Sequence, residues 1–119
     1  MTGNAEWLEG RVQHMREACR NIRADVGQAT KEQFLADGKT QRAVIESIMV
    51  IGEAASRVMR LDPSMEQTHA ELWQQFRDAS EMRNLLTHEY FRVDPSVVWT
   101  TVNNDLPELE RPLIGFTAG

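Results

Sequence analysis

Apolar residues recur at alternating steps of four and three positions along residues 7–26, and this spacing constrains the fold more than any other feature of the chain. An α-helix has about 3.6 residues per turn, so such spacing places the apolar side chains on one stripe of a helix. The sequence therefore predicts a long helix with one buried face that ends at Gly27. The stripe comprises Leu8, Val12, Met15, Cys19, Ile22 and Val26.

A second long helix is expected over residues 40–61, after a short one. Thr30 followed by Gln33 is typical of a capping box and predicts a short helix that ends near Leu35. Small residues around Gly52 in the second long helix favour the close approach of a neighbouring helix. The apolar stripe of this helix comprises Val44, Ile48, Ile51, Ala55 and Val58.

The middle of the chain has a weaker pattern. Residues 65–70 follow a turn and are expected to be irregular, and helix is expected to resume near Glu71. The helix that follows is expected to direct Met82, Leu85 and Leu86 toward the core.

The C-terminal part has a clear helix start. Asp94 suits the N-cap position and Pro95 the first helical position. Pro107 should kink or weaken the helix, and the tail beyond Pro112 is expected to fray. No segment alternates as a strand does, so we expect an all-α fold. It is predicted to be a single helical bundle of four to five helices that forms one domain over residues 1–119.

Composition limits the function classes. Hydrophobic residues make up 41% and charged residues 26% of the 119 residues, as in an ordinary globular protein. The net charge of −5 argues against a protein that coats nucleic acid, although an acidic protein can have a locally basic cleft. With one cysteine and no long apolar segment, we expect a reduced, cytoplasmic protein that does not contact a membrane. Trp7, Trp73 and Trp99 are interpreted as packing residues.

The chemistry-bearing segment is Met82–Phe91, which has an Arg-x4-His-x-Tyr pattern. Arg83 is a permanent cation that can bind a phosphate through two donors. His88 is of the residue type best suited to exchange protons near neutral pH. Together, these two side chains have the chemistry to cleave RNA without a metal ion or cofactor. No metal-ligand spacing and no phosphate-binding loop occurs in the sequence.

Helical geometry brings these residues together only in part. Asn84 and His88 are about 40° apart around a regular helix, and Arg83 and Tyr90 about 20° apart. Arg83 and His88, however, are separated by about 140°. Three solutions remain open: the arginine side chain wraps around the helix, the helix unwinds near Thr87, or two copies of the chain pool their residues.

The motif and its surroundings resemble the HEPN superfamily, and the added tyrosine resembles the HepT-like branch. Three segments resemble that family in its order. They are the central-helix segment Ile51–Ala55, the motif helix Met82–Phe91, and C-terminal positions from Val93 to Pro107. The ordered set is far more specific than an isolated Arg-x4-His pattern, which arises by chance in many helices.

The resemblance implies a function and a mode of control. It implies an endoribonuclease with Arg83 and His88 as the catalytic pair. From the residues themselves, Asn84 is expected to orient the phosphate or His88 by hydrogen bonding, and Glu53 suits a role in orienting Arg83. The resemblance further implies a homodimer in which two motif helices face each other. Tyr90 would be the acceptor of AMP from a cognate MntA-type minimal nucleotidyltransferase, the antitoxin of a two-gene module.

Less specific readings stand beside these expectations. Arg83 suits an ion pair with Glu53 or Glu81, and His88 suits an ordinary helix-surface or core position. Tyr90 suits simple packing at a helix end. The alternative function, from another class, is a noncatalytic helical partner or substrate-binding subunit of a minimal nucleotidyltransferase.

Overall fold

The computed structural model describes residues 2–89 and 92–117, with side chains from residue 5 onward. Every regular element in the described residues is a helix, which confirms the predicted all-α bundle. In chain order the elements are α1 (Thr2–Val26), α2 (Lys31–Leu35), α3 (Gly38–Leu61), α4 (Met65–Thr68), α5 (Ala70–Glu89), α6 (Pro95–Thr100), the π-helix η2 (Thr101–Asp105) and α7 (Leu106–Gly115).

The helix ends have the signals that the sequence predicts. Gly27 follows α1 with a φ of +55°, a left-handed conformation that glycine adopts without a steric cost. Thr30 and Gln33 form the expected reciprocal capping box of α2. The side chain of Asp94 accepts a hydrogen bond from the first turn of α6, as expected at an N-cap. Asp37, which the sequence did not mark as a helix start, does the same for α3. Local hydrogen bonding therefore fixes where these helices begin.

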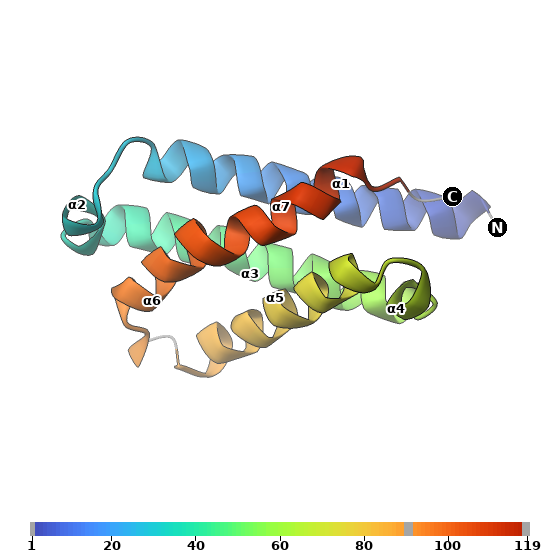
Figure 1. Ribbon diagram of the computed structural model, residues 1–119. Coiled ribbons are helices and arrows are strands. Elements are labelled where there is room, and N and C mark those ends of the chain that lie inside the picture. The colour runs from blue at the N-terminus through green and yellow to red at the C-terminus, as the bar shows by residue number, and fades with distance from the viewer. Residues whose placement is uncertain (1, 90–91, 118–119) are drawn as a thin grey trace.

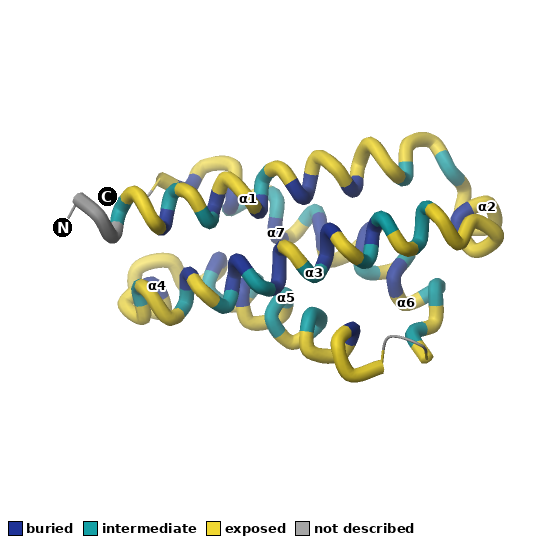
Figure 2. Tube along the Cα trace, turned by 180° about the vertical axis from the view of Figure 1, so that it is seen from behind, coloured by how far each residue is buried: buried dark blue, intermediate teal, exposed yellow. Residues whose placement is uncertain are grey.

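Helix α3 lies at the centre of the bundle, with α1 on one side and α5 on the other (Figure 1). The C-terminal segment formed by α6, η2 and α7 packs across one face of these three helices. Figure 2 shows the molecule from behind, with the buried positions recurring at intervals along the helices. The predicted stripe of α3 is buried throughout. That of α1 is buried from Leu8 to Ile22, and Val26 is partly buried.

Cys19 belongs to this core, as predicted. Its side chain is buried, and burial raises the pKa of its thiol to about 12. Nearly all of this thiol is therefore protonated at neutral pH, which excludes it as a nucleophile in the folded protein.

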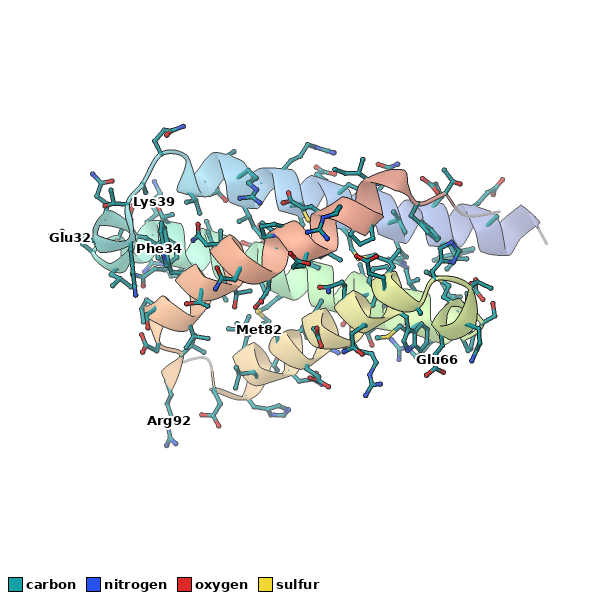
Figure 3. All side chains as sticks on the ribbon, in the orientation of Figure 1. Glu32, Phe34, Lys39, Glu66, Met82 and Arg92 are labelled. Carbon is teal, nitrogen blue, oxygen red and sulfur yellow. The ribbon has the colours of Figure 1, made fainter. Side chains whose placement is uncertain are left out.

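Three sequence-based expectations within the first ninety residues are wrong. Residues 65–70 include the short helix α4, because Met65 is 1% exposed and anchors that turn to the core. Leu85 is 45% exposed, since its neighbour Leu86 takes the core-facing position and adjacent residues on a helix point about 100° apart. The third is Trp7, which is 58% exposed and does not pack in the core. Met82, in contrast, points inward as predicted, from α5 toward the C-terminal segment (Figure 3).

The C-terminal tail also differs from expectation. Helix α7 continues to Gly115, and Leu113 and Phe116 are buried. The guanidinium of Arg16 in α1 donates hydrogen bonds to the carbonyl oxygens of Leu113 and Phe116. These bonds give hydrogen-bond donors to carbonyl groups at the C-terminal end of α7. They also hold the tail against α1 through residue 116. The disturbance expected at Pro107 takes the form of the π-helical turn η2 directly before α7.

The described residues contain no helix that is both long and apolar enough to cross a membrane.

The closest approach between α3 and α5 occurs at Gly52. A Cβ atom added there would lie 2.3 Å from Cβ of Arg83 and 2.7 Å from the carbonyl oxygen of Ala79. Both of these atoms belong to α5 close to its axis, so neither can move without a shift of the helix. Glycine at position 52 is therefore required for α5 to lie where it does, and for Arg83 to lie beside α3.

We expect Gly52→Ala to lower the free energy of unfolding by about 1–3 kcal/mol, because the added methyl group overpacks the α3–α5 contact. Gly10→Ala is the matched control. An added Cβ at Gly10, within α1, meets no atom within 4 Å, so that variant should gain about 0.5–1 kcal/mol of helix propensity. Urea denaturation measures both values. A Gly52→Ala protein as stable as Gly10→Ala would contradict the close packing.

Candidate active site

Arg83 lies on the face of α5 that contacts α3 and is held there by a carboxylate. Its Nη1 lies 3.1 Å from Oε2 of Glu53, and its side chain is 28% exposed. Glu53 directly follows Gly52, so the same close approach that brings the helices together also brings the two charges together. Of the two ion-pair partners proposed from the sequence, Glu53 is the one that the structure pairs with Arg83.

Glu53 also holds a second arginine. Its other oxygen, Oε1, accepts a hydrogen bond of 3.0 Å from Nε of Arg57, one turn later on α3. One carboxylate thus separates two guanidinium groups and leaves a net positive charge. Within the described part of the chain, Nε of Arg83 is shielded from solvent and has no hydrogen-bond partner. The pairing therefore fixes the orientation of Arg83 without using all of its donors.

Two adjoining hollows open beside this pair, and only residues of α1, α3 and α5 line them. The first has a volume of about 460 Å³ and includes His14, Glu46 and Thr87 in its wall. The second has a volume of about 530 Å³ and includes Trp7, Arg60 and Leu61. Arg11, Glu53, Arg57 and Arg83 contribute to both. The three helices that line the hollows, α1, α3 and α5, lie toward the viewer in Figure 2.

His88 and Asn84 lie elsewhere on the surface of α5. Both are exposed, and neither lines the hollows beside Arg83. The hydroxyl of Thr87 donates to the carbonyl oxygen of Arg83 at 2.9 Å, and α5 remains α-helical to Glu89. Unwinding near Thr87 is therefore excluded, and the guanidinium of Arg83 is directed to Glu53. Within one chain the structure joins Arg83 to Glu53 and leaves His88 apart.

Tyr90 lies outside the described residues, so its role as a modification site stays a prediction. The exposed side chain of Arg92 directly follows that gap and points away from the bundle (Figure 3). In the described residues no group of three His, Cys, Asp or Glu side chains is arranged to hold a metal ion.

The sequence did not single out the residues of α1 that belong to this surface. By sequence alone, Arg57 and Arg60 are typical of an ordinary solvated helix face. Nothing in the sequence shows that Arg11, near the start of α1, lies beside α5. The available signal was the spacing of four residues between Trp7 and Arg11, which places both side chains on one helix face.

The fold and the site define an all-α protein in which one long helix carries a fixed arginine and an exposed histidine. Residues 15–114 match the family described as "Ribonuclease HepT-like". The chain belongs to this HepT-like ribonuclease family, which confirms the resemblance drawn from its motifs.

Two relatives show the extent of this similarity. A protein of Thermococcus cleftensis named "Probable ribonuclease HepT" is 40% identical over 79 residues, which cover 66% of this chain and 67% of the relative. A candidate RNase of Caldanaerobacter subterraneus subsp. tengcongensis is 30% identical over 100 residues, with 84% and 85% covered. No solved structure matches the chain significantly.

Proposed function

We propose that the protein is a metal-independent endoribonuclease, the toxin of a HepT/MntA-type toxin–antitoxin module. The observation that carries the proposal is the arginine of the Arg-x4-His helix, held by Glu53 at the wall of an open hollow. A cation fixed in this way is suited to a phosphate whose negative charge grows during the reaction. The ribonuclease names of the relatives support the same activity.

The chemistry uses the nucleophile that RNA itself carries. The 2′-hydroxyl oxygen attacks the adjacent phosphorus, and the bond from phosphorus to the 5′-oxygen of the next nucleotide breaks. His88 takes the proton of the 2′-hydroxyl or gives a proton to the leaving oxygen. Arg83 stabilises the charge on the pentacoordinate phosphate, and Asn84 orients it. The products are a 2′,3′-cyclic phosphate and a 5′-hydroxyl end.

The active site is proposed to form between two copies of the chain. In one copy α5 is regular and Arg83 points to Glu53, so neither wrapping nor unwinding brings Arg83 and His88 together. Of the three solutions, pooling residues from two copies remains. A homodimer in which two α5 helices face each other would place His88 of one copy near Arg83 of the other.

Arg83→Ala and His88→Ala should each lower the rate of RNA cleavage in the presence of EDTA by about 10²-fold or more, because each removes a phosphate cation or a proton-transfer group. Arg77→Ala is the matched control, since Arg77 is an exposed arginine of α5 that lines neither hollow. A folded His88→Ala protein with the wild-type rate would remove the catalytic assignment. It would favour the noncatalytic partner function.

The same two variants test the shared site. Mixing Arg83→Ala with His88→Ala should restore activity to about a quarter of the wild-type value, because half of the dimers then contain one intact site of two. Each variant alone remains inactive and serves as the control. No recovery after subunit exchange, checked by light scattering and mixed-tag capture, would contradict a composite site.

Control is proposed to act through Tyr90. A cognate MntA-type nucleotidyltransferase would transfer AMP from ATP to the phenolic oxygen, with release of pyrophosphate. Tyr90 follows His88 by two positions and Arg83 by seven, so the attached phosphate would lie near the motif. A tethered phosphate would compete with RNA for Arg83 and would add bulk at the cleft.

Incubation with that enzyme and ATP should therefore add AMP-sized mass increments that map to Tyr90 and should lower RNA cleavage. Tyr90→Phe keeps the ring and removes the acceptor oxygen, so this variant should resist both changes. Intact-mass and peptide mass spectrometry measure the modification. The same increments on Tyr90→Phe would show that the acceptor lies elsewhere.

A further inference from the structure

We propose that the surface formed by Trp7, Arg11, Glu53, Arg57, Arg60 and Arg83, here called the arginine groove, binds the single-stranded RNA substrate beyond the scissile phosphate. In this inference, which rests on the proposed ribonuclease function, Arg57 and Arg60 contact backbone phosphates and Trp7 stacks on a base. The groove thereby leads the strand along α3 toward Arg83.

The arginine groove has an excess of positive charge. Four of the residues that line the second hollow are arginines and one is a glutamate, although the whole chain has a net charge of −5. A local positive surface on an acidic protein selects for a polyanion at this place and disfavours general binding elsewhere. The other end of the first hollow, at Glu46, lacks this excess.

The charged residues of the groove are regularly spaced along α3. Glu53, Arg57 and Arg60 follow at steps of four and three, so they lie on one face of the helix. The rise from Glu53, where Arg83 is held, to Arg60 is about 10 Å. At roughly 3.4 Å per nucleotide of a stacked strand, this length corresponds to about three nucleotides. The cations are therefore placed to contact successive phosphates.

An exposed aromatic ring lies beside these cations. The guanidinium of Arg11 lies 5.2 Å from the centre of the Trp7 ring, which fixes the ring at the wall of the groove. Trp7 is 58% exposed, so its ring is accessible to a base. Sites for single-stranded nucleic acid combine a cationic path with such an exposed ring, on which a base stacks.

Binding is measured separately from cleavage, in the full chain with His88→Ala as background so that the RNA stays intact. The probe is a fluorescein-labelled oligouridine of about twelve nucleotides, and the readout is fluorescence anisotropy over a range of salt concentrations. Arg60→Gln and Trp7→Leu alter exposed side chains, and Arg77→Gln on α5 is the control of equal charge change.

We expect Arg60→Gln to weaken binding by about 3- to 10-fold and to reduce the slope of log K against log salt by about 0.7, the loss of one phosphate contact. Trp7→Leu should weaken binding by about 5- to 100-fold without a change in the slope, since stacking releases no counterions. Arg77→Gln should change neither the affinity for RNA nor the slope of log K against log salt.

If Arg60→Gln and Arg77→Gln weakened RNA binding equally, the proposed groove would be contradicted, because the affinity would then reflect overall charge. Unchanged RNA binding in both groove variants would also contradict the proposal. Failure of the proposed function has a different signature: wild-type protein would not cleave RNA, whatever the groove variants bind.

Discussion

The contact of α3 with α5 at Gly52 is the constraint on which the rest of the structure depends. Because position 52 has no side chain, Cβ of Arg83 and the backbone of α5 lie directly against α3. That approach buries Leu86 in the core and presents Glu53 to Arg83. A larger residue at position 52 would separate the helices and the two charges at once, so one packing requirement supports both the fold and the site.

Glu53 gives this contact a chemical consequence. It takes one guanidinium on each oxygen, from Arg57 and Arg83, and so keeps two cations close together on one surface. The side chains remain partly exposed, which means that the pair contributes little to stability and can still face a ligand. The arrangement thus fits the proposed phosphate-binding role of Arg83 better than it fits stabilisation of the fold.

Most of the helices followed from local signals in the sequence. Apolar spacing predicted the long helices, and Thr30 and Asp94 marked helix starts that the structure confirms. What the sequence could not give depends on contacts between distant segments. Arg16 holds the C-terminal tail from the far end of the chain, and Trp7 with Arg11 joins the site through the packing of α1 on α3. The separation of His88 from Arg83 followed from helix geometry, but the direction of the arginine required the partner Glu53.

The most direct test of the central claim, that Glu53 positions Arg83 for catalysis, is the Glu53→Gln variant with its cleavage rate at saturating RNA measured beside its free energy of unfolding. We expect the cleavage rate to fall by about 10- to 100-fold, as when a supporting partner of a catalytic group is lost. The free energy of unfolding should change by less than about 1 kcal/mol, because both partners are partly exposed. A wild-type rate, or a loss of rate that only parallels unfolding, would contradict the central claim.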